Sequence, residues 1–369
     1  MRTLGIYGPK FPERSGVANY TDRLEAELSR RYRCVRVSND DWVDPSVFDR
    51  TLYQVGASIR HHCAFRALRL RPGPAVVHEH NCLSYYYEAW PLLEEEEREE
   101  FLRHLSGALG RGFDSLPGVL SCLDALADPD RYGADVGIEA LFMRRITGAV
   151  VHSPYVASLL RSRYPGVRVE TLPFMTTPLQ AAAGERIRER LGLSAGDHLF
   201  GVFGFIGEYK RIEKVLAAWY GWTDRPAGTR LVIVGQRQYE VEVPVSPHCL
   251  YLDYLPDEEE FDAYLAAADC GVQLRHPTLG ETSAVVSRLL ANGRRVILSR
   301  TPFTSPYRRS SRVIRIPPDE REVPALIEAF RHVARLPRPP LRYNPAHHLT
   351  AYVRRLVPLI ESAARVPQP

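Results

Sequence analysis

The residues best suited to chemistry lie in the stretch 274–297, which reads LRHPTLGETSAVVSRLLANGRRVI. A turn broken by Pro and Gly carries Arg275, Glu281, Thr282 and Ser283, and it leads into a short helical pattern. The N-terminus of a helix presents unpaired N–H groups and a partial positive charge, so it suits a phosphate. Glu281 beside it can accept hydrogen bonds from hydroxyl groups. Together they predict a sugar-nucleotide site. The alternative is an ordinary N-cap, in which Thr282 or Ser283 caps and Glu281 favours the helix dipole.

A lysine follows the strand pattern at 199–204, which runs into the sequence GFIGEYK. Gly204 and Gly207 permit a close approach to the backbone, and Lys210 is predicted to begin the next helix. A lysine at a helix start opposes the dipole, and a bound anion would resolve that conflict. A solvated lysine is the alternative, and it is the preferred interpretation of Lys214 one turn further on.

Two more strand exits carry candidate ligand contacts. Arg275 directly follows the strand predicted at 270–274, where a guanidinium can hold a diphosphate with two hydrogen bonds. An ion pair of Arg275 with Glu281 or Asp269 is the alternative. Gly235 follows the strand predicted at 230–234 and would let a ribose or nucleobase approach the backbone, although many ordinary turns carry such a glycine.

The order of these motifs resembles family 4 glycosyltransferases of the GT-B fold. The resemblance covers most of the chain, is strongest over 199–300, and rests on GF-x-G-x-x-K, VGQ, YLPDEEEFDAYLAAADCGVQLR and PTLGETS followed by ANGRRVI. It implies a retaining enzyme that moves a sugar from a nucleotide donor without a metal. By resemblance, Lys210 contacts the donor diphosphate, Glu281 contacts hydroxyls of the donor sugar, and amides at Thr282 and Ser283 hold the phosphate.

The chain departs from the family pattern at two positions. The arginine that family members carry five residues before the lysine is Phe205 here, and Arg275 is a candidate to replace its charge. The second glutamate of the family, which binds ribose, aligns with Arg288. Either ribose recognition or the donor nucleotide must therefore differ.

In the first half, strand one runs into GPKFPERSG, where Ser15 and Gly16 resemble the glycine-rich loop of the family near the donor phosphate. Lys10 in this loop can meet an anion or be solvated. The strand predicted at 75–78 ends at His78 and is followed by Glu79, His80 and Asn81, while Gly56 precedes His61 in a turn that also resembles part of the family.

Histidines at a strand edge raise the possibility of a metal, but no Cys or Asp spacing supports one and the family needs none, so no metal and no cofactor is expected. The preferred interpretation is that His80 or His78 contacts the transferred sugar. One sequence cannot show which of these two histidines faces the sugar, and a core role remains open for the one that points inward.

The elements that must position these residues alternate as in doubly wound α/β sheets. Strands are predicted in the first half at 3–7, 34–37, 52–55, 75–78, 148–152 and 167–172, and in the second at 199–204, 230–234, 250–254, 270–274, 295–299 and 313–316. Looser patterning over 81–144 predicts insertion helices. We expect two Rossmann-like domains, residues 1–178 on the acceptor side and 179–345 on the nucleotide-sugar side, with a helix at 346–369 crossing back. Since ligands of parallel sheets bind at the carboxyl ends of strands, the site is expected in an interdomain cleft.

Composition narrows the class of protein. The 369 residues are 45% hydrophobic and 25% charged, with a net charge of +4 and no basic stripe, so a nucleic-acid partner is not expected. Six cysteines without metal spacing suggest reduced thiols and the cytoplasm. No signal peptide or membrane span is predicted, and peripheral membrane contact stays open.

The sequence therefore predicts a glycosyltransferase that uses a nucleotide-sugar donor. The acceptor, a glycan, glycolipid or small molecule, is not readable. The alternatives are a nucleotide-sugar epimerase of the same fold, which would need placed acid and base carboxylates, and a non-catalytic nucleotide-sugar binder.

Overall fold

The computed structural model describes the chain except for residues 12, 14, 120–135, 245, 254, 256, 277, 279–281 and 363–369. The chain divides into two compact units. The first unit comprises residues 1–175, 278–282 and 348–369, and the second comprises 176–277 and 283–347. Each is built around its own six-stranded sheet.

The first sheet is parallel throughout and has the strand order β2-β1-β3-β4-β5-β6. Its strands are β1 (Arg2–Tyr7), β2 (Tyr32–Val37), β3 (Arg50–Val55), β4 (Gly73–Val77), β5 (Ile146–Val151) and β6 (Arg168–Thr171). The chain adds β2 on one side of β1 and then returns to add β3 on the other, so the order reverses between β1 and β3. All six strands predicted in the first half are confirmed.

The helices of the first unit include α3, α4 and α7 between β4 and β5, where the loose patterning predicted an insertion. The described α-helices of this unit are α1 (Gly16–Leu28), α2 (His62–Leu70), α3 (Leu83–Glu88), α4 (Glu95–Leu109), α7 (Ala140–Met143), α8 (Pro154–Arg163) and α14 (Leu349–Ser362). A capping box between Glu94 and Glu97 begins α4, and Gly110 ends it in the left-handed conformation.

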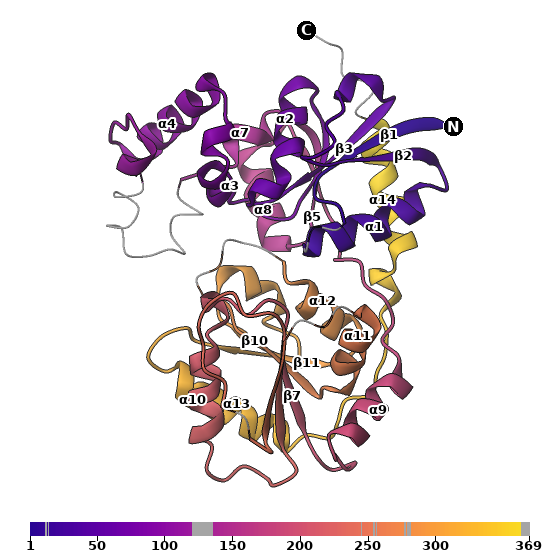
Figure 1. Ribbon diagram of the computed structural model, residues 1–369, viewed down its shortest axis with the longest axis vertical. Helices are drawn as coiled ribbons and strands as arrows, with labels where there is room; N and C mark the ends of the chain where they lie inside the picture. The colour runs from indigo at the N-terminus through magenta and orange to yellow at the C-terminus, as the bar shows by residue number, and fades with distance from the viewer. Residues whose placement is uncertain are drawn as a thin grey trace. The chain divides into compact units, whose positions relative to one another are not determined.

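The last helix, α14, belongs to the core of the first unit. It buries Tyr352, Val353, Leu356, Leu359 and Ile360 against α1 and strands β3 to β5, and Figure 1 shows α1 and α14 side by side. Burying such side chains stabilises a fold by about 1.5–3 kcal/mol each. The amphipathic spacing of this segment is therefore explained by the face it buries.

The second sheet is also parallel and has the order β12-β11-β10-β7-β8-β9. Its strands are β7 (Leu199–Phe203), β8 (Arg230–Val234), β9 (Cys249–Leu252), β10 (Cys270–Gln273), β11 (Arg295–Ser299) and β12 (Val313–Ile316). Here the order reverses between β7 and β10. All six strands predicted in the second half are confirmed.

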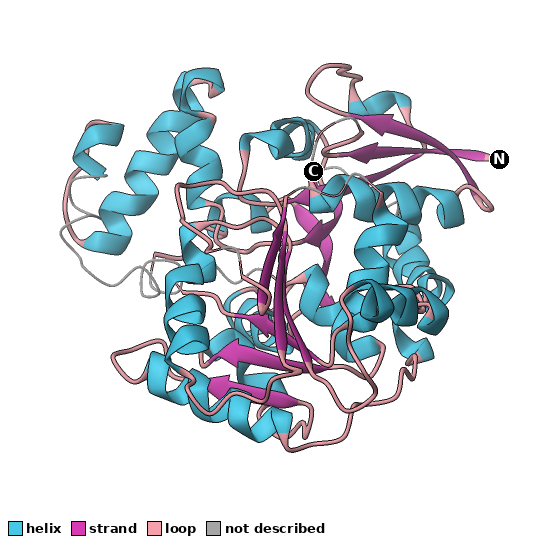
Figure 2. Ribbon diagram, turned by 60° about the horizontal axis from the view of Figure 1, so that its bottom comes forward, coloured by secondary structure: helices cyan, strands magenta, loops and turns pink. Residues whose placement is uncertain are grey.

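Helices cover both faces of this sheet, as Figure 2 shows around its strands. They are α9 (Ala181–Arg190), α10 (Ile212–Gly221), α11 (Glu258–Ala267), α12 (Ala284–Ala291) and α13 (Glu322–Ala334). Successive side chains of a strand point to opposite faces. Phe200 and Val202 accordingly pack with α10 and α13, whereas Leu199 and Phe203 pack with α9, α11 and α12.

The prediction that Lys210 begins a helix is wrong. Lys210 ends a 3-10 turn (Glu208–Lys210), and α10 begins only at Ile212. Between them Arg211 adopts the left-handed conformation with φ 54°, and its guanidinium pairs with the buried carboxylate of Glu322 at 2.6 Å. A left-handed residue interrupts helical hydrogen bonding, so Lys210 does not oppose the dipole of α10 as its first residue.

Candidate functional site

In the second unit, the candidate site lies at the carboxyl ends of β7 and β10. The strand order reverses between these two neighbours, and ligands of open parallel sheets bind at such a switch point. The chain leaves β7 through Gly204 and leaves β10 through Leu274 and Arg275. The topology therefore brings the GFIGEYK segment and the segment that leads to α12 to one edge of the sheet.

Lys210 lies between the ends of these two strands and is 3% exposed. Its Nζ donates a hydrogen bond to the carbonyl oxygen of Phe203 at 2.9 Å and another to Oε1 of Gln273 at 2.8 Å. These oxygens belong to the last residues of β7 and β10. The ammonium group is thus held at the switch point, which excludes the interpretation of Lys210 as a solvated surface lysine. Lys214 is exposed, as predicted.

Gly204 allows the ammonium group and helix α12 to lie close together. Its φ is +88°, and a Cβ at this position would lie 3.9 Å from Nζ of Lys210 and 3.7 Å from Cγ2 of Val285 in the first turn of α12. Gly235, which follows β8, lies against the backbone of Gly204, since a Cβ at Gly235 would lie 1.9 Å from the carbonyl oxygen of Gly204. A side chain at Gly235 would therefore collide with the loop after β7.

The first turn of α12 follows Ser283, whose Oγ accepts a hydrogen bond from the amide of Val286 at 3.3 Å. The ordinary N-cap predicted as an alternative is therefore present. It does not exclude a phosphate, since a helix leaves four amides without partners in the helix and this cap serves one of them. Thr282 is half-buried beside Ser283. Glu281 lies outside the described residues, so its predicted contact with sugar hydroxyls stays a prediction.

Arg275 joins the exit of β10 to the turn that carries Lys210. Its guanidinium carbon lies 5.0 Å from the centre of the Tyr209 ring, and the amide of His276 donates to the carbonyl of Tyr209 at 2.9 Å. The alternative ion pair with Asp269 is wrong, because Asp269 precedes β10 at its other end and pairs with Arg188 at 3.0 Å. The structure thus brings Gly204, Lys210, Arg275 and Ser283 to one sheet edge.

Arg288 in α12 is held by two carboxylates of α11. It forms a short ion pair with Asp262 and a longer one with Glu258 at 3.6 Å, and its guanidinium lies over the Phe261 ring at 5.6 Å. Arg288 is 8% exposed. Its positive charge is therefore largely compensated inside the second unit.

In the first unit, the predicted histidines gather around Gln54 of β3. His61 Nδ1 donates to the backbone carbonyl of Gln54 at 2.7 Å, and His78 Nε2 donates to its side-chain Oε1 at 2.8 Å. The rings of Tyr20 and His152 lie 4.8 Å and 5.7 Å from that of His78. We call these five residues the histidine cluster.

Burial keeps this cluster neutral. It lowers the pKa of His61 to about 4 and that of His152 to about 4, because a buried imidazolium loses its hydration. The pKa of His78 is lowered well below its usual value by burial, and the nearby His152 and His61 add to the effect. Neutral imidazoles can both donate and accept hydrogen bonds, which suits them to hydroxyl groups.

His78 and His80 differ in exposure. His80 is 1% exposed and Asn81 is 2% exposed, whereas His78 remains partly exposed. Glu79 accepts a hydrogen bond from the amide of Ala57 at 2.5 Å, so its carboxylate fastens the loop after β3. Of the two histidines that the sequence left open as the sugar contact, His78 is more accessible than His80.

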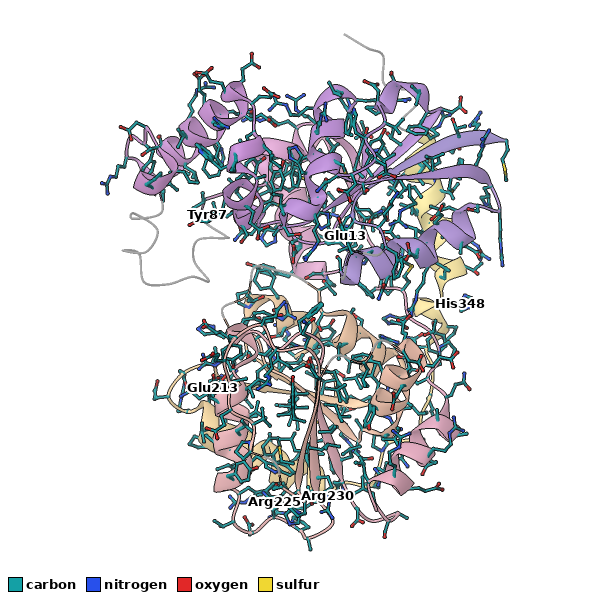
Figure 3. All side chains as sticks on the ribbon, in the orientation of Figure 1. Glu13, Tyr87, Glu213, Arg225, Arg230 and His348 are labelled. Carbon is teal, nitrogen blue, oxygen red and sulfur yellow. The ribbon has the colours of Figure 1, made fainter. Side chains whose placement is uncertain are left out.

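The loop after β1 carries Ser15 and Gly16 to the start of α1. Ser15 caps this helix by accepting from the amide of Val17 at 3.2 Å. Apart from the chain neighbours of Gly16 and the backbone of its own helix, no described atom lies within 4 Å of the position of a Cβ on Gly16. This open space would admit a ligand close to the backbone. Lys10 forms a short ion pair with Asp41 and its side chain is 36% exposed, so its predicted contact with an anionic ligand stays a prediction. Figure 3 labels Glu13 in the same loop and Tyr87 on α3.

Sequence reasoning missed Gln54 and Gln273, which position His78 and Lys210. Each is the one polar residue of an otherwise apolar run, LYQV in β3 and CGVQ in β10, and each is less than 5% exposed. A buried amide needs hydrogen-bond partners, so these interruptions were a usable signal. In the part of the chain that the structure describes, no group of three His, Cys, Asp or Glu residues could hold a metal ion. No described helix is long and apolar enough to cross a membrane.

Solved structures similar to this chain match it over nearly its whole length. The sucrose-phosphate synthase of Thermosynechococcus elongatus is 18% identical, with a TM-score of 0.53 over 99% of this chain and 96% of that one. Anabaena HepE in complex with UDP is 12% identical, with a TM-score of 0.55 over 98% and 100%. The catalytic domain of starch synthase IV from Arabidopsis thaliana, bound to ADP and acarbose, is 13% identical, with a TM-score of 0.52 over 99% and 100%.

These similarities establish the fold. Two parallel six-stranded sheets with flanking helices make up the GT-B fold, which confirms the fold predicted from the sequence. No family model matches the sequence, and no curated protein matches it.

Proposed function

We propose that the protein is a glycosyltransferase that moves a sugar from a nucleoside diphosphate sugar to an acceptor hydroxyl. The observation that carries the proposal is the ammonium group of Lys210, buried at the β7/β10 switch point and fixed by Phe203 and Gln273. A buried positive charge beside the first turn of a helix suits a diphosphate. Bound UDP and ADP in the HepE and starch synthase structures support this choice of ligand.

The chemistry proposed is transfer with retention, as in family 4 glycosyltransferases. The bond between the anomeric carbon and the diphosphate oxygen breaks, and the acceptor oxygen bonds to that carbon from the same face. The acceptor proton passes to the leaving diphosphate, so neither an enzyme nucleophile nor a metal is required. The work of the protein is then positioning and stabilisation of charge.

The following roles are proposed for the residues at the carboxyl ends of the second sheet and in the segment before α12. Lys210 and Arg275 stabilise the charge that grows on the leaving diphosphate, and amides at Thr282 and Ser283 contact its oxygens. Glu281 accepts hydrogen bonds from the donor sugar. The backbone at Gly235 leaves room for the nucleoside, whose ribose is bound without the carboxylate that Arg288 replaces.

In the first unit, we propose that His78 contacts the transferred sugar, with His80 as the alternative. Ser15 and Gly16 are proposed to approach the donor phosphate. The acceptor is a glycan, a glycolipid or a small molecule. The cytoplasm is proposed as the location, with peripheral membrane contact possible for a lipid acceptor.

The two alternative functions are a nucleotide-sugar epimerase and a non-catalytic nucleotide-sugar binder. An epimerase needs acid and base carboxylates, and Glu79, the candidate from the sequence, instead accepts from the amide of Ala57. A non-catalytic binder is favoured by the engaged Arg288 and by Phe205. An enzyme forms product from a labelled donor, whereas a non-catalytic binder does not.

A thermal-shift screen with nucleoside diphosphates and their sugars tests ligand binding, because a ligand of the folded state raises the Tm. The nucleotide sugar that raises the Tm is then given to the protein with its sugar labelled, and transfer of the label to water or to candidate acceptors is measured. Binding with turnover supports the enzyme, and binding without turnover supports the binder. If no nucleotide raises the Tm, the proposal is wrong.

A further inference from the structure

Besides the crossings on either side of residues 278–282, two segments carry the chain between its units, and both are attached to the C-terminal end of α12. The chain passes from the first unit to the second at residues 175/176 and returns at 347/348. Figure 3 labels His348, which leads into α14. We call 176–179 the outgoing segment and 342–347 the return segment.

The side chain of Asn292 holds the outgoing segment. Its Oδ1 accepts from the amide of Leu179 at 2.8 Å, and its Nδ2 donates to the carbonyl of Thr177 at 3.1 Å. Nδ2 also donates to the carbonyl of Arg288 in α12 at 2.9 Å. Asn292 is 1% exposed, so water does not compete for these bonds.

The backbone at the same point holds the return segment. The amide of Arg342 donates to the carbonyl of Asn292 at 3.1 Å, and the amide of Asn344 donates to that of Ala291 at 2.7 Å. Gly293, with φ +82°, permits this approach, because a Cβ there would lie 3.1 Å from the carbonyl oxygen of Pro340. Both segments are thus bonded to a single turn of the chain.

The outgoing and return segments are also bonded to each other. The amide of Thr176 donates to the carbonyl of His347 at 2.9 Å, and the hydroxyl of Tyr343 donates to the carbonyl of Thr176 at 2.7 Å. The Tyr343 bond does not involve α12. It therefore offers a matched control for the bonds of Asn292.

Helix α12 connects this turn with the proposed phosphate site. It spans Ala284–Ala291, about 12 Å at 1.5 Å per residue. A short helix moves as one body, so a shift at its first turn also moves its last turn. A ligand at the N-terminal end thereby acts on hydrogen bonds at the C-terminal end.

We propose that Asn292 is a positioning residue that couples binding of a nucleoside diphosphate at α12 to the two segments joining the units. This inference rests on the proposed function, which places the diphosphate at the first turn of α12. Asn292 lies at the end of α12 opposite to the proposed phosphate site. It acts by transmitting the binding event to residues 176–179 and 342–347, and the coupling is reciprocal.

Hydrogen exchange with and without UDP or ADP tests the coupling in the full chain. In the wild type, the nucleotide should slow exchange at 283–287 and also in both segments. In Asn292→Ala, slowing at 283–287 should persist and slowing in the two segments should be lost. Sugar release from the donor should fall about 10-fold, the size of a typical coupling, while the Kd for the nucleotide changes by less than about 3-fold.

Tyr343→Phe is the control, because it removes one bond between the segments and leaves α12 attached to both. It should retain the nucleotide-dependent slowing and the rate. A purely structural role of Asn292 would lower the Tm and leave the pattern of slowing intact. If Asn292→Ala does not fold, Asn292→Asp, which keeps the acceptor for Leu179 and loses the donor to Thr177, should weaken slowing in the outgoing segment.

Two results overturn the inference separately from the function. Either Asn292→Ala retains the slowing in both segments, or Tyr343→Phe loses it equally. In both cases the nucleotide still binds at 283–287, so the proposed function stands. A wild type in which neither UDP nor ADP slows exchange at 283–287 overturns the phosphate site and the coupling with it.

Discussion

Replacing Lys210 with Met removes the ammonium group while keeping an unbranched apolar stem of similar length. Lys210 is 3% exposed, so its charge acts in a site with little water. At an effective dielectric constant of about 20, two unit charges about 4 Å apart interact by about 4 kcal/mol. Loss of one preorganised contact to a developing anion typically costs about 2.7–4 kcal/mol. Lys210→Met should therefore reduce kcat about 100- to 1,000-fold.

The same change removes a donor from the carbonyl of Phe203 and from Oε1 of Gln273. Each buried acceptor left without a partner costs about 1–3 kcal/mol, and this loss is partly offset because a charge need no longer be buried. The Tm must accordingly be measured beside the rate. Nucleotide release at saturating donor gives kcat, and calorimetric titration gives the Kd for the nucleoside diphosphate.

Lys214→Met is the matched control, since Lys214 is exposed on α10 and its loss removes the same formal charge. It should leave kcat and Kd near the wild-type values. If Lys210→Met is folded and releases nucleotide within about 3-fold of the wild-type rate, far less than the loss of such a contact implies, then Lys210 does not stabilise the leaving group.

Three further predictions concern stability and binding. Unfolded histidine titrates near pH 6.5, and burial lowers the pKa of His61 and of His152 to about 4. The unfolded chain thus binds more protons than the folded chain between these pH values, so lowering the pH from 7 to 5 should reduce the free energy of unfolding by about 2 kcal/mol per histidine. The urea midpoint should therefore fall as the pH is lowered, and it should fall less in His61→Gln. Gly235→Ala should abolish nucleotide binding in a thermal-shift assay, because its Cβ would lie 1.9 Å from the carbonyl oxygen of Gly204, and unchanged binding would contradict this account. Leu356→Ala on α14 should destabilise the first unit by about 2–5 kcal/mol in urea unfolding, and a loss below 1 kcal/mol would show that α14 is dispensable there.

Regular patterns made the elements of both sheets readable from the sequence. Apolar runs of four to six residues separated by amphipathic segments identified the twelve strands, since a parallel sheet buries both of its faces. The strand order was not readable, because it depends on pairings between segments distant in sequence. The two switch points, and hence the position of Lys210 between β7 and β10, emerge only from the structure.

The candidate site was predicted in part. Gly204, Lys210, Arg275 and Ser283 share one sheet edge, as strand exits should. The state of Lys210 was misjudged, because the left-handed Arg211 delays the helix and no local propensity signals that conformation. A lone glutamine in an apolar run signals that Gln54 and Gln273 need partners, but which residues they bind depends on tertiary contacts that no local pattern encodes.

The packing of α14 has a consequence for biosynthesis. The apolar surface that this helix covers on α1 and β3 to β5 leaves the ribosome well before its cover, which is made from residues 349–362. Domains generally begin to fold from the N-terminus during synthesis. Here the earlier-made unit must wait until residues 349–362 have been translated, so the later-made unit, which ends at residue 347, can finish first. A translation product interrupted before residue 349 would expose this apolar surface, to which chaperones would bind.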